Sequence, residues 1–261
     1  MDIKHTLHEL KDGWHRRELW LLLGKRDVHA RYRGSFIGVF WIMLNVALVG
    51  GVMGLLYSHI LHESPTYYVP YLLVGFTTWN LLSTLITDSC RVFSSNAVAM
   101  KEIQAPNTLY VFRIIWKNVL TFLYGLSVYG LACILLKRPP SWSMLLSIPA
   151  LLLIILNGLW VGLLLGSLCS RFRDVEQLVK SGLRFLFFVT PVLWVATHTG
   201  WRAELALWNP LYYFLELVRA PLLGQSPAYF VWLTAISISL IGWIVTLCLY
   251  SRYSRRLSSW I

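Results

Sequence analysis

The sequence predicts an all-α polytopic membrane protein with six transmembrane helices, an amino-terminal amphipathic interface helix and a pair of re-entrant helices on the external side. Hydrophobic residues make up 57% of the chain and charged residues 13%, whereas a soluble domain carries about a quarter charged residues. Several uncharged stretches exceed the roughly 20 residues that cross a bilayer as a helix. The basic residues gather between these stretches, which is typical of membrane topology and not of a nucleic-acid-binding surface.

Residues 1–35 form the first predicted region, a cytoplasmic interface segment. It holds eight basic and five acidic residues and lacks the apolar core of a cleavable signal peptide, so we expect the first span itself to direct insertion. We expect an amphipathic helix over residues 3–14 that lies along the membrane surface. Its apolar residues recur at helical spacing: Ile3, Leu7, Leu10 and Trp14.

Six spans are predicted within the next region, residues 36–250. The third span carries Arg113 and Lys117 in its first turns, where long basic side chains can reach the interface. The fifth span is short and contains Pro191. The predicted spans cover about residues 36–60, 67–87, 112–136, 144–168, 185–200 and 228–250.

Orientation follows from the basic residues between the spans. The amino-terminal segment, the loops 91–117 and 171–184 and the tail 251–261 together hold nineteen Lys and Arg, and the opposite side holds four. Since positive charge marks the cytoplasmic side, an even number of spans places both termini, including the tail, in the cytoplasm.

The external segment 201–224 is neither a span nor an ordinary loop. Its uncharged stretch, residues 205–215, is too short to cross and is interrupted by Asn209-Pro210. A pair of short helices that dip into the outer leaflet would satisfy both facts, because irregular backbone is tolerated where protein covers it. The alternative is a folded external cap that never enters the bilayer.

Several functional motifs are absent. The sequence has no phosphate-binding loop, no zinc-protease motif and no paired carboxylates inside a predicted span. None of the four cysteines forms a C-x-x-C pair, so neither a metal site nor a disulfide framework is predicted. We therefore expect no catalytic site and no cofactor on this chain, and any transport must draw its energy from another protein.

Small and aromatic residues suggest packing and lining roles within the spans. Gly158, Gly162 and Gly166 recur every fourth residue and would let another helix approach closely. Aromatic faces pack well against the C–H faces of sugars, and four such residues lie within or near spans, where ordinary packing is the alternative role: Phe76, Trp79, Phe188 and Trp194.

Short motifs follow one another over nearly the whole chain. The run from Arg17 to Trp41 contains Arg26-Asp27, Arg31-Tyr32-Arg33, Ser35 and Gly38. Further along come Gly75-Phe76, Trp79-Asn80, Asn96, Lys101, Pro106, Arg171-Phe172-Arg173-Asp174, Thr190-Pro191-Val192-Leu193-Trp194, Asn209-Pro210-Leu211-Tyr212, Arg219 and Leu222-Leu223-Gly224. Taken in this order, the chain resembles the polysaccharide-exporting permeases of ABC transporters of the ABC-2 type.

This resemblance implies a homodimeric channel in the bacterial inner membrane, docked on a dimer of a separate cytoplasmic ATPase that binds ATP and Mg²⁺. It implies an undecaprenyl-pyrophosphate-linked polysaccharide such as O antigen as cargo, moved to the periplasm among the membrane lipids. The segment 201–224 would be a periplasmic gate. Its candidate residues are Asn209, Pro210, Tyr212, Tyr213 and Arg219.

The resemblance also assigns roles on the cytoplasmic side. The loop 94–106 would hold a short coupling helix for the ATPase, with Asn96, Lys101, Glu102 and Pro106 at or near the contact; a solvated loop is the alternative. Further candidates for ordering the second loop and contacting the ATPase are Arg171, Arg173 and Asp174.

Arg31 and Arg33 lie where the chain reaches the membrane. Guanidinium groups suit a lipid-borne pyrophosphate, but topology anchoring explains them equally well. Two other functions stay open: an ABC-2 permease for teichoic acid, capsule or a drug, and a membrane enzyme of lipid-linked sugar metabolism. An enzyme would need a carboxylate cluster or a His–Asp arrangement at the membrane surface, and the seven histidines are scattered over both sides.

Overall fold

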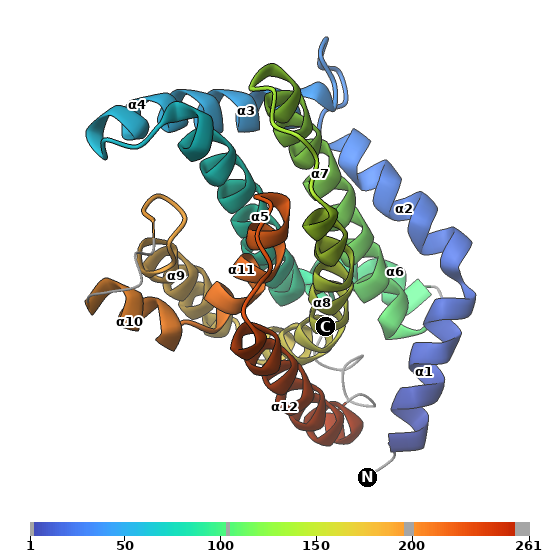
Figure 1. Cartoon of the computed structure of the whole chain (residues 1–261). Helices are drawn as coiled ribbons and strands as arrows, with labels where there is room; N and C mark the ends of the chain where they lie inside the picture. Colours follow the sequence, from blue (N-terminus) through green and yellow to red (C-terminus); the bar gives the residue numbers. More distant parts are fainter. Residues whose placement is uncertain (1–2, 103–104, 196–200, 254–261) are drawn as a thin grey trace.

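The computed structural model describes residues 3–102, 105–195 and 201–253, and every regular element within these ranges is a helix. This confirms the predicted all-α class. The helices, drawn in Figure 1, are α1 (Ile3–His15), α2 (Arg17–Ala30), α3 (Phe40–Ala47), the π-helical turn η1 (Leu48–Val52), α4 (Met53–Ile60), α5 (Pro65–Arg91), the 3-10 turn η2 (Ser94–Asn96), α6 (Ala97–Glu102), α7 (Asn107–Leu135), the 3-10 turn η3 (Trp142–Leu146), α8 (Ser147–Arg171), α9 (Asp174–Val189), α10 (Trp201–Trp208), α11 (Pro210–Leu222) and α12 (Tyr229–Tyr253).

Among the described residues, five helical stretches are long and apolar enough to cross a membrane. They agree with the predicted first, second, third, fourth and sixth spans to within a few residues at each end. These stretches are Phe40–Ile60, Pro65–Arg91, Asn107–Leu135, Trp142–Arg171 and Tyr229–Arg252.

The predicted fifth span, 185–200, has different bounds in the structure. Its helix, α9, begins eleven residues earlier at Asp174 and ends at Val189, and residues 196–200 lie outside the described ranges. Two acidic residues, Asp174 and Glu176, occupy the first turn of α9, where they interact favourably with the helix dipole. At the other end, Thr190 adopts an extended conformation, as expected before Pro191.

The segment from α9 to Val195 follows α5 along most of its length. At one end, Glu176 pairs with Arg91, the last residue of α5, with Nε and Oε1 2.5 Å apart. At the other end, the hydroxyl of Tyr68, in the first turns of α5, donates to the carbonyl oxygen of Leu193. A helix of sixteen residues followed by a short turn therefore runs antiparallel to α5 between its two ends.

Segment 201–224, which the sequence predicts to be external, contains two short helices, α10 and α11, separated at Asn209 as predicted. Asn209 caps α11 by accepting a hydrogen bond from the Leu211 amide at 3.0 Å, and Pro210 takes the first helical position. The first turn of α11 shares a cavity with Leu85 and Trp160, whereas its last residue, Leu222, accepts a hydrogen bond from Tyr129 of α7. Most of residues 213–222 are buried in the bundle, whereas Pro210 at the first helical position is exposed.

Helix α5 is the centre of the bundle. In its most apolar window 67% of the residues are buried, against 22% for Phe40–Ile60 and 28% for Tyr229–Arg252. The core lies along α5 in two main clusters. One cluster joins α5 to α11, and the other joins α5 to α8 and to the first half of α7. The poorly buried helices leave apolar surface that lipid or another protein must cover.

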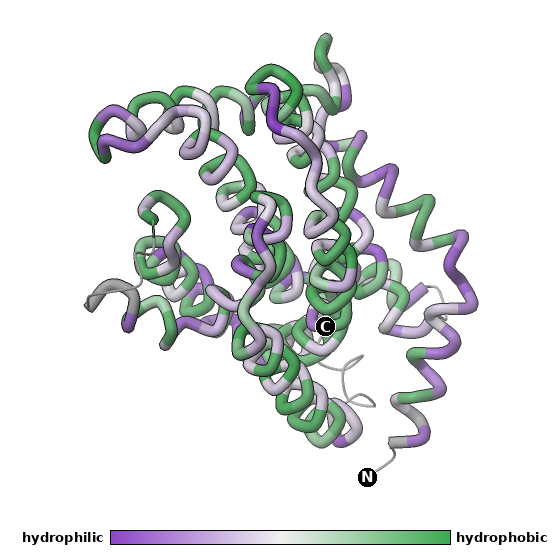
Figure 2. Tube along the Cα trace, viewed as in Figure 1, coloured by the Kyte–Doolittle hydropathy of each residue, from purple (hydrophilic) through white to green (hydrophobic). Residues whose placement is uncertain are grey.

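Helices α1 and α2 lie along the outer side of α7 (Figure 1). Hydrophilic residues recur along both, whereas α12 is mainly hydrophobic (Figure 2). The predicted helix at 3–14 is confirmed as α1, but the residues that it buries are Thr6, Glu9 and Gly13. Leu7 and Trp14 of the predicted apolar face stay about half exposed, at 54% and 52%.

Candidate functional site

The loop 94–106 contains the predicted short helix, α6, although residues 103–104 lie outside the described ranges. Ala99 and Met100 pack against the protein core. The opposite side of α6 carries Val98, which is 70% exposed, together with the exposed charges of Lys101 and Glu102. The helix therefore presents an apolar side chain flanked by one positive and one negative charge.

Asn96 has an internal role in the same loop. Its Nδ2 donates to the carbonyl oxygen of Val92 at 2.7 Å, and its Oδ1 accepts from Nη1 of Arg113 at 3.0 Å. Pro106 stands immediately before the first residue of α7 in an extended conformation. These two predicted residues position the loop, and the exposed side chains of α6 are Val98, Lys101 and Glu102.

Two ion pairs fix α7 to its neighbours at the same end of the bundle. Arg113 donates from Nε and Nη2 to the two carboxylate oxygens of Asp27 on α2, each at 2.7 Å. One turn further, Lys117 lies 2.7 Å from Asp88 of α5, which also accepts from Asn118 at 2.8 Å. The charges expected in the first turns of this span are thus neutralised by partners on two other helices.

Glu9 ties α1 to the same end of α7. Its carboxylate accepts from the backbone amide of Asn107 at 2.9 Å and from the hydroxyl of Tyr250 on α12 at 3.0 Å. Its backbone carbonyl accepts from Thr108 at 2.6 Å. One acidic residue of the amino-terminal helix therefore caps α7 and connects it to α12.

The turn between α8 and α9 places Arg171, Arg173 and Asp174 at the surface. The ion pair that joins this region to α5 comes instead from Glu176, which lies 2.5 Å from Arg91 of α5 and also 2.5 Å from Lys180 of its own helix. These two cations lower the pKa of Glu176, with the hydrogen bond from Lys180 as the main cause. Glu176 was not among the residues that the sequence singled out.

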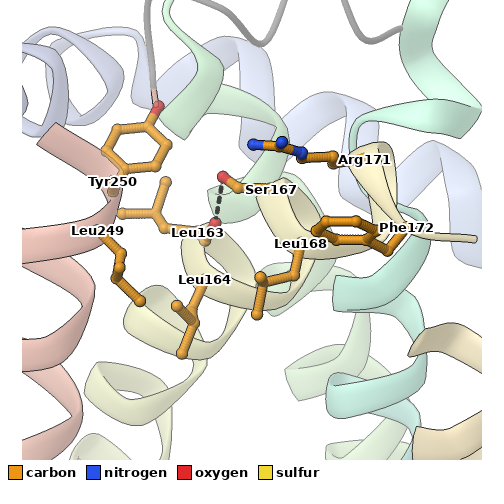
Figure 3. Close-up of a pocket in the computed structure, with 8 residues that line it drawn as sticks. All are labelled: Leu163, Leu164, Ser167, Leu168, Arg171, Phe172, Leu249 and Tyr250. Carbon is orange, nitrogen blue, oxygen red and sulfur yellow. Dashed lines mark hydrogen bonds between the residues drawn. The ribbon is translucent and has the colours of Figure 1, made fainter. Parts of the chain in front are cut away.

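Arg171 extends over a small pocket between α8 and α12, to which Leu249 and Tyr250 contribute from α12 (Figure 3). The cavity measures about 180 Å³ and is mainly lined by leucine side chains. The guanidinium also lies 5.2 Å from the ring centre of Phe172. The surroundings of Arg171 thus combine a cation with apolar surface at the end of a spanning helix.

Arg31 and Arg33 are both exposed in the connection between α2 and α3. Gly34 and Gly38 of this connection adopt positive φ angles of 84° and 59°, a backbone conformation that favours glycine. Arg31 lines a cavity that continues between α3, α5 and α7, and Arg33 is not among the residues lining it. The structure therefore separates two arginines that the sequence treats as equivalent.

Two of the four predicted aromatic residues line an open groove of about 560 Å³ between α5 and α9, called the aromatic groove below. Trp79 lies 5.5 Å from the ring of Phe187, which in turn lies 5.5 Å from Phe188. Trp194 donates to the carbonyl oxygen of Phe188 at 3.2 Å, and Phe76 packs against the first core cluster. Ser83, Thr84, Thr87, Lys180 and Arg184 add hydroxyl and cationic groups.

Arg219, one of the predicted gate residues, contacts the turn after α9. Arg219, 3% exposed, pairs with Glu216 at 2.5 Å and donates to the carbonyl oxygen of Pro191. The guanidinium lies 4.3 Å from the ring centre of Tyr71, whose hydroxyl is 2.9 Å from the carbonyl oxygen of Trp194. This external cluster (Tyr68, Tyr71, residues 190–194, Glu216 and Arg219) fixes the turn to α5 and α11.

Three further gate residues stabilise α11 from its amino-terminal end. Asn209, 2% exposed, donates to the hydroxyl of Thr190 at 2.5 Å. Tyr213 donates to the carbonyl oxygen of Leu207 at 2.7 Å, and its ring lies 5.5 Å from that of Tyr212. The break at Asn209-Pro210 is therefore held from both sides, by α9 and by α10.

The three glycines of α8 face the centre of the bundle. A Cβ added to Gly158 would lie 3.0 Å from Leu85, and one added to Gly162 would lie 2.5 Å from Val111. At Gly166 the nearest atom, on Val92, would be 2.6 Å away. Each glycine thus allows close approach of α5 or α7.

Sequence reasoning missed the partners of these residues. Asp27 could have been found by asking which acid neutralises a cation in the first turns of the third predicted span. Glu9 could have been found by asking which acid caps the start of the same helix. Tyr68 and Tyr71 gave no such signal, because a tyrosine near a span end is expected in any membrane protein.

Comparison with known proteins gives a consistent result. The sequence profile of the ABC-2 type transporter family matches residues 18–223. The chain is 26% identical over 178 residues to an O-antigen export system permease protein of Myxococcus xanthus, covering 68% of each chain. It is 22% identical over 207 residues to the protein of the same name from Klebsiella pneumoniae, covering 75% of this chain and 80% of the relative.

Proposed function

Because the chain belongs to the ABC-2 type transporter family, we propose that it is the channel-forming permease subunit of an ATP-driven exporter of undecaprenyl-pyrophosphate-linked polysaccharide, of the O-antigen type. The cargo class is supported by two relatives that are named O-antigen export system permeases. The proposed complex contains two copies of this chain and a dimer of a separate cytoplasmic ATPase that binds ATP and Mg²⁺, in the bacterial inner membrane.

The observation that carries the proposal is the exposed face of α6. Its apolar Val98, 70% exposed, stands beside exposed Lys101 and Glu102 on a helix of six residues. The other side of the loop is anchored to α7 through Asn96 and Arg113. A short, firmly held helix with such an exposed face is suited to fit a cleft on the ATPase and to transmit the movement of the ATPase to the spanning helices.

The proposed topology has six crossings, with both termini in the cytoplasm. The sixth crossing is supplied by α9 and residues 190–195, because this segment contacts α5 at Arg91 and again at Tyr68. With α9 as a crossing, α10 and α11 form the proposed re-entrant gate on the periplasmic side, and the first turn of α11 lines a cavity together with Leu85 and Trp160. The aromatic groove between α5 and α9 supplies a candidate lining for a sliding sugar chain.

Co-purification with the ATPase tests the coupling assignment. We expect the charge-swap variant Lys101→Glu/Glu102→Lys to lose most of the bound ATPase, because like charges would then face each other across the contact. The matched control swaps two exposed opposite charges on α2, Arg17→Glu/Glu18→Arg. Full assembly of the first variant would refute the assignment of α6.

Gene deletion tests the transport function itself. The exporter predicts that completed, lipid-linked polymer accumulates on the cytoplasmic side of the membrane. Unfinished polymer would instead indicate an enzyme of sugar assembly. Complementation with the natural sequence should restore the polymer at the cell surface, which separates a loss of transport from a secondary defect.

A further inference from the structure

A second cavity, which adjoins the aromatic groove at Thr84, lies between α3, α5 and α7. Its volume is about 370 Å³, within the range of small-molecule sites. Arg31 and Tyr32 line it from the connection after α2, and Trp41 lines it just inside the first turn of α3. The cavity therefore runs from the proposed cytoplasmic boundary into the spanning part of a single subunit.

The lining of this cavity is unusually polar for its position. Eight of its fourteen lining residues carry hydroxyl, amide or guanidinium groups. Three helices supply the deeper polar residues: Asn45 from α3, Thr77, Asn80 and Thr84 from α5, and Asn118 and Thr121 from α7. Because an unsatisfied polar group in a membrane costs several kcal/mol, a purely structural space between these helices would favour apolar side chains.

Several of these polar groups lack a partner within the described part of the chain. Thr77 is 3% exposed, and its hydroxyl is buried without a hydrogen bond to any described residue. The side-chain amides of Asn45 and Asn80 also make no hydrogen bond within the described ranges, and Asn118 uses only its Nδ2, toward Asp88 and its own helix. The amides of Asn45, Asn80 and Asn118 therefore offer donors and acceptors to a ligand from three sides of the cavity, and the buried Thr77 hydroxyl would join them if its side chain turned toward the ligand.

Charge is distributed unequally between the two ends of the cavity. Arg31 is exposed at one end, where a guanidinium can bind a phosphate oxygen pair. The deeper residues are uncharged amides and hydroxyls, and the nearby Asp88 and Lys117 neutralise each other at 2.7 Å. A matching ligand therefore carries an anion at one end and an uncharged, hydroxyl-rich group at the other.

Apolar surface beside the cavity suits the remaining part of such a ligand. Trp41 and Phe122 add aromatic faces to the lining, which pack well against sugar C–H groups. Leu48, the first residue of η1, follows Asn45 by three residues and so lies on the same side of the continuing helix, and it is 54% exposed. A lipid chain can follow this surface outward into the bilayer.

We propose that this cavity binds the head of a phosphate-bearing glycolipid, with the phosphate at Arg31 and the first sugar among Thr77, Asn80 and Asn118. The assignment rests on the proposed function, since it identifies the lipid end of the cargo as the part that each subunit holds. It places this recognition on residues of one subunit, in a cavity that adjoins the aromatic groove at Thr84. Discrimination comes from the sugar, because a lipid with a bare phosphate leaves the amides and the Thr77 hydroxyl unsatisfied.

Binding measurements on the full-length chain in phosphatidylcholine nanodiscs test the proposal. The probe is a short-chain polyprenyl pyrophosphate that carries one N-acetylhexosamine, and it is compared with the same lipid without the sugar and with phosphatidylglycerol. We expect the sugar-bearing lipid to bind about tenfold more tightly than the bare pyrophosphate, the effect of one or two net hydrogen bonds. Arg31→Gln should weaken binding of both polyprenyl lipids.

Two neighbouring threonines provide a matched pair of variants. Thr77→Val should lose most of the preference for the sugar-bearing lipid, and Asn80→Leu should abolish it. Thr78→Val is the control: Thr78 is also buried with a hydroxyl that has no described partner, but it does not line the cavity. A melting-temperature measurement on each variant separates lost binding from lost folding.

Three results would overturn the assignment: equal affinity of the natural chain for the two polyprenyl lipids, equal competition by phosphatidylglycerol, or an unchanged preference in both Thr77→Val and Asn80→Leu. The exporter function would survive these results if the ATPase still co-purifies and export continues. Conversely, a chain that prefers the sugar-bearing lipid but binds no ATPase would contradict the proposed function and leave the cavity assignment intact.

Discussion

Arg113 on α7 and Asp27 on α2 form a two-pronged ion pair, with both hydrogen bonds 2.7 Å long. The third arm of the same guanidinium reaches Asn96 at 3.0 Å. One side chain therefore joins α2, the spanning helix α7 and the loop that presents α6. A force applied to α6 would be transmitted to α2 and α7 through rigid contacts, since the planar guanidinium fixes all three directions.

Replacing Asp27 with asparagine should loosen this junction. The two side chains are only 23% and 27% exposed, so we expect Asp27→Asn to lower the free energy of unfolding by about 2 kcal/mol, typical of lost hydrogen bonds to a charged group. Thermal unfolding in detergent measures the effect. Glu18→Gln removes an exposed carboxylate from the same helix and should leave the unfolding temperature nearly unchanged.

ATPase co-purification with the Asp27→Asn variant extends this test to coupling. Loss of the ATPase with only a small change in unfolding temperature would show that the ion pair positions α6 for its partner. An unchanged unfolding temperature together with full ATPase binding would contradict the role assigned to the pair.

Arg219→Lys should weaken the external cluster although the charge is kept. Lysine lacks the planar fork that serves both Glu216 and the Pro191 carbonyl, and it packs less well over the ring of Tyr71. Since Arg219 is 3% exposed, we expect a loss of about 2 kcal/mol in stability, measured by thermal unfolding. The same substitution at Arg138, which is partly exposed, is the control and should have little effect.

Glu176 should make the α5–α9 contact sensitive to acid. Its pKa is lowered in the folded chain by Lys180 and Arg91, so its stabilising contribution is complete above the unfolded pKa of about 4.3 and is lost as the pH falls through the lower folded value. We expect the difference in unfolding temperature between the natural chain and Glu176→Gln to be constant from neutral pH down to about pH 5 and to shrink below that. A difference that grows toward low pH would have the wrong sign and would refute the pairing.

The helical class and five spans could be predicted because long uncharged stretches and the placement of basic residues report directly on the bilayer. The bounds of α9 could not, because its first half is polar and only tertiary contacts such as Glu176 with Arg91 and Phe187 with Trp79 show that it runs along α5. The sequence likewise did not show which face of α1 is exposed. The helical spacing of its apolar residues can be recognised in the sequence. The inward position of Glu9 cannot, because it depends on hydrogen bonds from the amide of Asn107 and the hydroxyl of Tyr250.

The candidate site residues also differ in whether their position could be predicted from local sequence or depends on tertiary contacts. Lys101 and Glu102 were placed on an exposed helix as the sequence suggested, whereas Asn96 turned out to bond within the chain. Distant contacts such as that between Asn96 and Arg113 depend on tertiary packing, which no local pattern in the sequence encodes.

Gly162→Ala and Gly130→Ala should shift stability in opposite directions. Both place a methyl group on a spanning helix, but at Gly162 it would lie 2.5 Å from Cγ1 of Val111, whereas at Gly130 nothing lies within 4 Å. Val111 is β-branched and fully buried, so it has little freedom to move aside. We expect Gly162→Ala to cost about 1–3 kcal/mol through overpacking and Gly130→Ala to add up to about 1 kcal/mol through helix propensity. Thermal unfolding of the two variants side by side measures both effects, and equal shifts of the same sign would show that the glycines of α8 do not set the distance to α7.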